Sequence, residues 1–493
     1  MANGKNANPF SVSPMIIERT ILRARSIASL VFQLLIISCS DHSIAQAPYV
    51  TPTEPAVAAK LERWKDLKFG LLMHWGPYSQ WGVVESWSIC PEDEDWCKRK
   101  PQHGATYAEY MKNYEALQTT FDPVKFDPDK WAKAAKGAGM KYVVFTTKHH
   151  DGFCMFDTRT TDYRITSPNT PFHSSQRANV TKEVFSAFRK QGLWTGAYFS
   201  KPDWHSPDYW WPYFPPKDRS VNYLPTKHPD RWQAFKDHTY TQIEELMTGY
   251  GPVDILWLDG GWVRPLNTID TNVSWQKAIT IEQDIDMPRI ATMARQHQPG
   301  LLVVDRTVGG ENENYITPEG HVPDADLGVP WETCMPMGTS WSWVPNEQYK
   351  TTDEIISTLV SVVSRGGSLL LNVAPGPDGQ LDSTAYVRLK EVGEWLKVNG
   401  EAVYGTRPIE QYREMILAHT VAKDSSAQYL FGDVGGMTWS FDWNGTKLPK
   451  AIALKNGMPL KVYRQGGFPT IKIPRKLHPE EGGGMMVVKL IAR

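Results

Sequence analysis

The sequence has little cysteine and almost no net charge, and both features narrow what the protein can do. Only 5 of its 493 residues are cysteine. No two of them are spaced as Cys-x-x-Cys, and no cysteine–histidine spacing is typical of a zinc site. Lysine plus arginine (53) balance aspartate plus glutamate (54), which gives a net charge of −1. Proteins that bind nucleic acid carry basic patches, so this balance argues against nucleic acid as the main partner.

Long apolar runs are also absent, apart from one stretch near the N-terminus. Arg23 and Arg25 precede apolar residues 27–37, a run too short to span a bilayer comfortably. Basic, apolar and small residues in this order are typical of a signal sequence. The stretch that ends at Cys39 resembles a bacterial lipoprotein signal, in which Cys39 would be lipidated and would attach the protein to a membrane; ordinary cleavage after Ala45 is the alternative. We therefore predict an exported protein, either periplasmic or an outer-membrane-anchored lipoprotein, with secretion as the alternative.

Aromatic residues, in contrast, are plentiful. The chain contains 20 tryptophans and 20 tyrosines. Aromatic rings stack on the C–H faces of sugars, which favours a carbohydrate ligand, but large barrels also use aromatic residues in their cores. The composition is 41% hydrophobic and 22% charged, as expected for globular domains, and the length allows two or three of them.

Helix-like and strand-like patterns alternate along most of the chain. Helices are predicted at 56–65, 105–120, 128–138, 181–191, 229–249, 287–297, 353–364 and 384–397. Strands are predicted at 68–76, 141–147, 193–200, 253–259, 301–306 and 366–373. This alternation predicts a parallel sheet. Nearly all of the strands end in polar residues, which favours an α/β barrel of the TIM type over an open sheet. We find no repeat at the level of the sequence itself.

The composition changes after residue 400. Short β-like runs separated by glycine, proline and asparagine predict a small antiparallel β-sandwich. The predicted division is a leader and linker at 1–48, an irregular (β/α)8-like catalytic barrel at 49–400 and a C-terminal β-sandwich at 401–493.

One strand end stands out because it combines a buried run with an acid. Residues 255–258 (Ile-Leu-Trp-Leu) are apolar, as in a strand that is buried on both faces, and Asp259 follows them. An ionised carboxylate is costly inside such a core, so Asp259 is expected at the strand's C-terminal mouth, where barrel enzymes collect catalytic groups. A residue that only caps a helix or starts a turn is the alternative.

A second strand end carries a dense polar cluster, Lys148-His149-His150-Asp151. A metal site is one interpretation. Neighbouring residues on an extended chain point to opposite sides, however, so the two histidines are poorly placed to hold one ion. Binding of sugar hydroxyl groups fits them better, and we predict no metal.

A glycosidase needs a second carboxyl group on another loop. Glutamates are frequent in the stretch that follows Arg306, and the residue types alone do not decide among Glu311, Glu313, Glu319 and Glu332.

Six stretches, in order along the chain, resemble the α-L-fucosidases of glycoside hydrolase family 29. They are Phe-Gly-Leu-Leu-Met-His-Trp-Gly at 69–76, Lys-His-His-Asp-Gly-Phe at 148–153, Thr-Asp-Tyr at 161–163, Leu-Trp-Leu-Asp-Gly-Gly at 256–261, Arg-Gly-Gly-Ser-Leu-Leu-Leu-Asn-Val at 365–373 and Asn-Gly-Glu-Ala-Val-Tyr at 399–404. The resemblance implies exo-hydrolysis of terminal α-L-fucose with retention, on a (β/α)8-like barrel followed by a β-sandwich. It implies no cofactor, and fucosylated oligosaccharides or glycoconjugates as partners.

The resemblance also implies roles for individual residues. Asp259 matches the family nucleophile. Glu319, in Thr-Pro-Glu, resembles the acid/base, and Glu332 is the second choice. The residues expected to bind substrate are His74, Glu85, Trp87, His149, His150, Tyr198, Trp257, Arg306 and, as an aromatic wall, Trp341 or Trp343, of which Trp343 is chosen.

Two other functions are considered. One is a related barrel exo-glycosidase such as an α-galactosidase, because L-fucose and D-galactose share hydroxyl stereochemistry. The other is an inactive glycan-binding lipoprotein, against which the intact pair of carboxyl groups argues.

Overall fold

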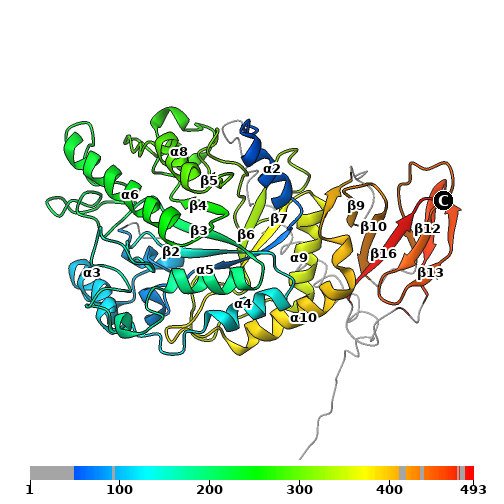
Figure 1. Cartoon of the computed structure of the whole chain (residues 1–493), viewed down its shortest axis with the longest axis horizontal. Helices are drawn as coiled ribbons and strands as arrows, with labels where there is room; N and C mark the ends of the chain where they lie inside the picture. The colour runs from blue at the N-terminus through cyan, green and yellow to red at the C-terminus, as the bar shows by residue number, and fades with distance from the viewer. Residues whose placement is uncertain (1–48, 92–94, 410–417, 434–437, 475–476, 478–483) are drawn as a thin grey trace, which may run out of the picture.

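A computed structural model describes residues 49–493, apart from 92–94, 410–417, 434–437, 475–476 and 478–483. The leader predicted at 1–48 therefore lies outside the described residues. The described chain forms a sheet wrapped by helices, followed by a smaller all-β part that carries the C-terminus (Figure 1).

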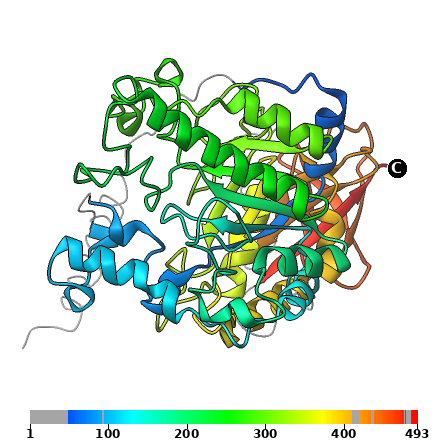
Figure 2. The same ribbon diagram turned by 60° about the vertical axis from the view of Figure 1, so that its left-hand side comes forward.

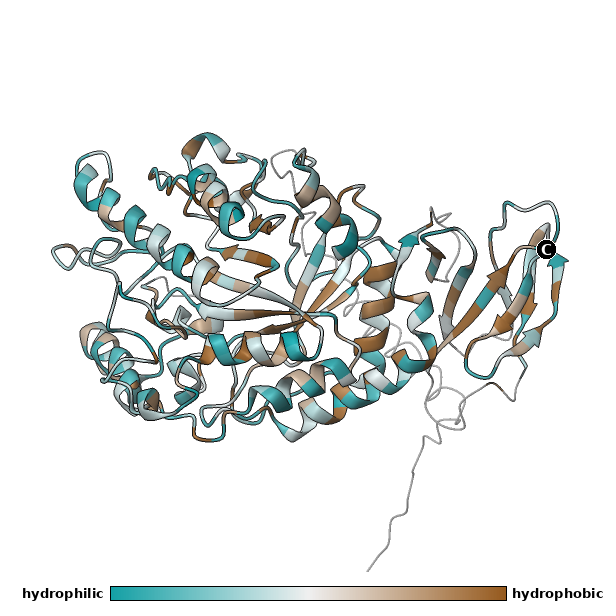
Figure 3. Ribbon diagram, in the orientation of Figure 1, coloured by the Kyte–Doolittle hydropathy of each residue, from teal (hydrophilic) through white to brown (hydrophobic). Residues whose placement is uncertain are grey.

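Seven parallel strands form the centre of the first part, in the order β5-β4-β3-β2-β1-β7-β6. They are β1 (Phe69–Met73), β2 (Tyr142–Lys148), β3 (Trp194–Ser200), β4 (Ile255–Asp259), β5 (Leu302–Asp305), β6 (Glu332–Pro336) and β7 (Ser368–Asn372). Almost all of their residues are buried, as expected for strands that are covered on both faces. Hydrophobic residues accordingly concentrate in these central strands (Figure 3).

Helices cover the outside of this sheet, as the two views in Figures 1 and 2 show. The helices are α2 (Pro55–Trp64), α3 (Tyr107–Glu115), α4 (Pro128–Gly137), α5 (Val180–Lys190), α6 (Pro229–Gly249), α7 (Ser274–Lys277), α8 (Met287–His297), α9 (Thr352–Ser364) and α10 (Ser383–Asn399). Local signals place several of their ends: the Asp127 side chain accepts from the Lys130 amide at the start of α4, and Thr351 and Glu354 form a capping box at the start of α9.

An irregular segment, 312–320, joins the two edges of the seven-stranded sheet. On one side the Asn314 backbone amide donates to the Val303 carbonyl of β5 (2.9 Å). On the other side the Gly320 amide donates to the Cys334 carbonyl of β6 (2.9 Å). Isolated bridges pair Val304 with Glu313, Ile316 with Trp331 and Glu319 with Cys334. The ring is thereby closed, which confirms the predicted irregular barrel.

The C-terminal part contains two antiparallel sheets. The six-stranded sheet has the order β13-β12-β16-β10-β9-β8, and the three-stranded sheet has the order β11-β15-β14. The strands are β8 (Thr406–Pro408), β9 (Ala418–Ala422), β10 (Gln428–Asp433), β11 (Thr438–Ser440), β12 (Lys450–Ala453), β13 (Met458–Leu460), β14 (Val462–Gln465), β15 (Phe468–Lys472) and β16 (Met485–Ile491). Buried side chains from both sheets, among them Leu430, Trp439, Ile471 and Val488, form one core between them, so the predicted sandwich is confirmed.

The sandwich contacts the barrel at the end where the strands begin. Arg407 and Lys423 pair with Asp66, just before β1 (2.7 and 2.8 Å). The Trp395 indole of α10 donates to the Met485 carbonyl (2.9 Å). The exact division at residue 400/401 remains a prediction. Within the described ranges, no helix is both long enough and apolar enough to cross a membrane.

Candidate active site

One large cavity, of about 1460 Å³, lies at the other end of the barrel. Because the seven strands are parallel, the loops that follow them meet at this end. The predicted residues that line the cavity are His74, Glu85, Trp87, His149, His150, Tyr198, Trp257, Asp259, Arg306 and Glu319. The structure thus brings together side chains that are more than 200 positions apart in the sequence.

Asp259 is the last residue of β4, and it lines the cavity. The side chain is 20% exposed. Oδ1 accepts from Arg306 Nη1 (2.7 Å) and Oδ2 accepts from the Tyr198 hydroxyl (2.6 Å). Burial alone would raise the pKa of Asp259, but the Arg306 charge, the nearby His150 and the Tyr198 hydrogen bond hold this pKa well below its usual range. The group is therefore an ionised, oriented carboxylate at neutral pH.

Arg306, which directly follows β5, links Asp259 to a second acid. Its Nη2 donates to Glu319 Oε2 (2.7 Å), and its Nε donates to Thr317 Oγ1 (3.1 Å). The guanidinium also lies 4.3 Å from the centroid of the Trp257 ring, which is a cation–π contact. Glu319 sits on the segment that closes the barrel and is 49% exposed. One guanidinium thus holds two carboxylates at the rim of the same cavity.

The three buried histidines of the cavity are neutral at pH 7. Burial is the main cause that lowers the pKa of His74 to about 4 and that of His150 to about 3, and it holds the pKa of His149 well below its usual value. Neutral imidazoles can accept hydrogen bonds from hydroxyl groups.

Hydrogen bonds outside the cavity fix the tautomers of two of these histidines. The Asn372 amide nitrogen donates to the Trp341 carbonyl (2.6 Å), so Asn372 Oδ1 accepts from His74 Nδ1 (2.9 Å). The Ser200 hydroxyl donates to the Pro202 carbonyl (2.7 Å), so its oxygen accepts from His150 Nδ1 (2.7 Å). Both rings therefore carry their proton on Nδ1 and have an accepting Nε2.

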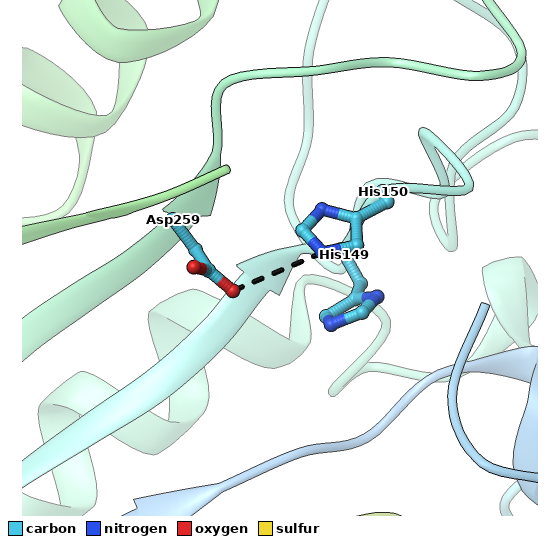
Figure 4. Close-up of side chains that lie close together, drawn as sticks. All are labelled: His149, His150 and Asp259. Atoms are coloured by element: carbon cyan, nitrogen blue, oxygen red, sulfur yellow. Dashed lines mark ion pairs between the residues drawn. The ribbon is translucent and has the colours of Figure 1, made fainter. Parts of the chain in front are cut away.

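His149 and His150 do not point to opposite sides, contrary to our expectation. Strand β2 ends at Lys148, and the chain then turns: the Gly152 amide donates to the His149 carbonyl (3.1 Å), with φ of Gly152 at +79°. The two ring centroids lie 4.1 Å apart. Figure 4 shows both rings beside Asp259, with His150 Nε2 3.8 Å from Asp259 Oδ2.

These three side chains also have the composition of a transition-metal site. Their ligand atoms lie within 4.8 Å of one another, and imidazole and carboxylate are common ligands. However, the Arg306 guanidinium is bonded to the same carboxylate (2.7 Å), and its charge opposes a second cation there. The arrangement suits hydroxyl groups better than a metal ion.

Glu85 is a third acid in the cavity, and its protonation state is opposite to that of Asp259. Burial is the main cause that raises its pKa well above the usual value, and the charges of Glu319 and Asp259 act in the same direction. Its Oε1 has no hydrogen-bond partner among the described residues. Its φ of +28° is strained for a residue with a side chain, and such strain is concentrated at functional sites. Glu85 therefore offers a neutral carboxyl group to a ligand.

Glu332 lies behind the cavity rather than in it. It is fully buried, is not among the lining residues, and accepts from the Tyr142 hydroxyl (2.5 Å) and the Trp257 indole (3.1 Å). Burial raises its pKa to about 7, a value that would suit a general acid. Geometry decides against that role, because a general acid must reach the bond that it protonates.

The aromatic wall is formed by a different tryptophan from the one chosen. Trp341 lines the cavity, whereas Trp343 does not; the Trp343 indole instead donates to Asp382 (3.3 Å). Residues two apart in an extended segment share a face, but the chain between β6 and α9 is irregular, so their spacing did not predict which of them faces inward.

Sequence reasoning assigned no role to Asn372, Ser200, Arg264 or Trp275. The first two are polar residues at the ends of predicted strands, so the signal that pointed to Asp259 applied to them as well. Arg264 and Trp275 lie in a stretch without periodicity, and no signal there singles them out.

Comparison with known proteins decides the family. The model of the family described as alpha-L-fucosidase matches residues 36–401, well over half of the chain. The chain belongs to the α-L-fucosidase family. The rat tissue α-L-fucosidase is 28% identical over 420 residues, which is 81% of this chain and 82% of the rat protein.

Solved structures of α-L-fucosidases have the same fold. The α-L-fucosidase isoenzyme 1 of Paenibacillus thiaminolyticus is 26% identical, with a TM-score of 0.70, over 89% of this chain and 100% of that one. A GH29 α-L-fucosidase of Bacteroides thetaiotaomicron was trapped as a covalent intermediate in complex with 2-fluoro-fucosyl fluoride. It is 24% identical, with a TM-score of 0.68, over 92% of this chain and 99% of that one. These findings confirm the predicted family, the predicted enzyme class, a glycoside hydrolase, and the predicted α-L-fucosidase activity.

Proposed function

We propose that Asp259 is the nucleophile and Glu319 the acid/base of this retaining α-L-fucosidase. The observation that carries the assignment is Arg306, whose Nη1 and Nη2 each lie 2.7 Å from one of the two carboxylates. Retaining glycosidases hold their carboxyl groups about 5–5.5 Å apart, against about 6.5–9.5 Å in inverting enzymes. Two short bonds to one guanidinium favour the smaller separation. The covalent intermediate trapped in the Bacteroides relative is in keeping with this route.

The reaction proceeds in two displacements. Asp259 attacks the anomeric carbon of fucose while the bond to the leaving oxygen breaks and Glu319 gives that oxygen a proton. Glu319 then takes a proton from water, the water attacks the anomeric carbon, and the bond to Asp259 breaks, which restores the carboxylate. The Tyr198 hydroxyl on Asp259 Oδ2 (2.6 Å) keeps the nucleophile oriented.

The remaining lining groups bind the sugar. The Nε2 atoms of His74 and His150 accept from its hydroxyl groups, and the neutral Glu85 can donate or accept. Apolar groups that line the cavity, among them Leu72 and Cys334, favour the C6 methyl group of fucose over the hydroxymethyl group of galactose. We therefore expect hydrolysis of an aryl α-L-fucoside and little hydrolysis of the matching aryl α-D-galactoside.

Azide rescue with product analysis tests the two roles separately. Asp259→Gly should be nearly inert, and azide should then attack an activated α-fucoside directly and give the β-fucosyl azide. Glu319→Ala should still form the fucosyl-enzyme from an activated substrate, and azide should then give the α-fucosyl azide. The stereochemistry of the azide product, measured by NMR, distinguishes the two.

Glu332→Gln is the control for the acid/base, because it replaces a buried carboxyl group beside the cavity with a group of the same shape. It should retain most of its activity on a fucoside with a poor leaving group, whereas Glu319→Ala should lose about two to four orders of magnitude in rate. The reverse result would transfer the acid/base role to Glu332.

We also propose that the protein is exported and lipidated at Cys39. The basic, apolar and small-residue order of residues 19–40 supports it. Cys39→Ala, produced in a bacterium that processes lipoproteins, should move the enzyme from the membrane fraction to the soluble fraction of the envelope. If both forms are soluble, the leader is removed by ordinary cleavage.

A further inference from the structure

The cavity is larger than a fucosyl group requires. Its volume of about 1460 Å³ exceeds the range of about 300–1,000 Å³ that holds a drug-sized ligand. The buried histidines and Trp257 form its inner part. The cavity is also lined by exposed residues, namely His321, Asp324, Asn272, Trp96 and Trp275. These exposed residues form the outer part of the cavity, and two of them border the catalytic loops: His321 Nδ1 donates to the Glu319 carbonyl (3.0 Å), and the Trp275 ring lies beside Gly261.

Trp275 is exposed although it is a large aromatic residue. The residue is 41% exposed and lies on the short helix α7. Polar side chains, including those of the exposed residues Asn272, His321 and Asp324, line the same cavity. An aromatic face beside hydrogen-bonding groups matches a sugar, which has an apolar C–H face and a rim of hydroxyl groups.

The segment that carries Trp275 is tied to both catalytic loops. Arg264 is fully buried; its Nη1 donates to Gln276 Oε1 on α7 (2.7 Å), and its other nitrogens donate to the carbonyls of Gly261 and Thr307. Gly261 lies two residues after Asp259, and Thr307 directly follows Arg306. Trp275 is thus held in a fixed position relative to the nucleophile and to the guanidinium that holds Glu319.

We propose that Trp275 is the platform of a leaving-group subsite in which the sugar that carries the fucose stacks on the indole ring. The proposal rests on the proposed function, because Glu319 marks where the glycosidic oxygen must lie. It assigns to this chain a glycan as leaving group, bound through one sugar ring, and it makes Trp275 a residue that determines specificity.

The test compares substrates with and without a leaving-group sugar. α-L-Fucosyl fluoride has no leaving-group surface to bind, whereas 2′-fucosyllactose, 3-fucosyllactose and α1,6-fucosyl-N-acetylglucosamine each present a sugar. For the one of these that the wild type hydrolyses best, Trp275→Ala should lower kcat/KM about tenfold or more. The value for the fluoride should change less than about twofold. Trp275→Phe keeps a smaller ring, so its kcat/KM on the oligosaccharide should lie between the values for the wild type and Trp275→Ala.

Tyr213→Ala is the matched control, because Tyr213 is an exposed aromatic residue outside the cavity lining. Tyr213→Ala should leave kcat/KM unchanged on both the fluoride and the oligosaccharide. An equal loss on fluoride and oligosaccharide in Trp275→Ala would show that Trp275 acts only by supporting the catalytic loops, and it would overturn the subsite. The subsite would also be overturned if Trp275→Ala lost no kcat/KM on either substrate, or if the wild type hydrolysed the fluoride but none of the three oligosaccharides. A wild type that does not hydrolyse the fluoride would instead refute the proposed function, and the subsite with it.

Discussion

Asp259 and Glu85 are carboxylic acids in the same cavity, yet their surroundings shift their pKa values in opposite directions. Asp259 is bonded to the Arg306 guanidinium and the Tyr198 hydroxyl, which favour the ionised form. Glu85 is buried near the charges of Asp259 and Glu319, which favour the neutral form. A pair of acids held in different protonation states is typical of an enzyme that needs one anion and one hydrogen-bond donor.

The raised pKa of Glu85 predicts that Glu85→Gln stabilises the protein, increasingly so at higher pH. Below the unfolded-state pKa of about 4.3, both states are protonated and Glu85 has no effect of this kind. Above it the unfolded state ionises while the folded state does not, so the wild type loses about 1.4 kcal/mol of unfolding free energy per pH unit until the folded pKa is reached. Glutamine does not ionise and removes this loss.

Urea unfolding of wild type and Glu85→Gln between pH 4 and pH 8 measures the effect. The difference in unfolding free energy should be nearly constant at the acid end and should grow as the pH rises. Glu394→Gln, at an exposed position on α10, controls for the loss of a carboxyl group. A difference that does not depend on pH would mean that Glu85 is ionised in the folded protein. For activity, Glu85→Gln should retain more kcat/KM than Glu85→Ala, because the amide still donates and accepts.

The strands show how far the sequence predicts the architecture. Runs such as Ile255 to Leu258 are apolar throughout and end in an acid, so both the strand and the place of its last residue follow from burial. The predicted helix at 287–297 has the observed bounds of α8. The segment 312–320 was not predicted as part of the barrel wall, because it is polar and has no apolar run or period. Glu319 was therefore assigned by resemblance, and only the structure shows that it lies on the segment that closes the barrel.

Arg264 is a buried, structurally important residue that the apolar pattern of the sequence does not indicate. Its guanidinium bonds to α7 and to the carbonyls of Gly261 and Thr307, and burial, its largest influence, lowers its pKa to about 10. Nothing in the local sequence indicates a buried arginine, because its partners are the Gln276 side chain and backbone carbonyls of loops that meet only in the folded barrel. Tertiary packing alone creates this anchor.

Arg264→Lys should therefore weaken the protein although it keeps the charge. Lysine cannot reproduce the planar fork, and carbonyls left unpaired in a buried site each cost about 1–3 kcal/mol. We expect a lower urea midpoint, faster proteolytic cleavage within 265–283 and reduced kcat/KM on both α-L-fucosyl fluoride and oligosaccharides. Arg289→Lys, at a partly exposed position on α8, is the control. Unchanged cleavage in Arg264→Lys would mean that the segment is held by other contacts.

In the whole molecule, the cavity and the C-terminal sandwich lie at opposite ends of the barrel. The cavity opens where the parallel strands end, and the sandwich attaches where they begin, through Asp66 and through α10. Conventional barrel enzymes divide their ends in the same way, with activity at the carboxyl ends of the strands and stability at the other end. The sandwich is therefore expected to support the barrel rather than to shape the fucose pocket.

The division of roles between the two ends of the barrel can be tested by changing Asp66 to asparagine, which replaces one carboxylate oxygen with an amide nitrogen. Its carboxylate accepts from Arg407 Nη1 (2.7 Å) and Lys423 Nζ (2.8 Å). Burial acts to raise its pKa, but these two hydrogen bonds and charges lower it below the usual value. A lowered folded pKa stabilises the protein above the unfolded pKa of about 3.9, and this stabilisation is lost as the pH falls through the folded pKa.

Asp66→Asn should thus lower the unfolding free energy by about 1 kcal/mol at pH 7 and by less near pH 3. Urea unfolding at both pH values measures this, and Asp122→Asn, at an exposed position on the barrel, is the control. Arg407→Ala combined with Asp66→Asn should destabilise less than the sum of the two single changes, because they remove the same interaction. In every variant kcat/KM on α-L-fucosyl fluoride should match the wild type. A change in that value would show that the sandwich influences the fucose pocket through the length of the barrel strands, and the division of roles between the two ends would then be wrong.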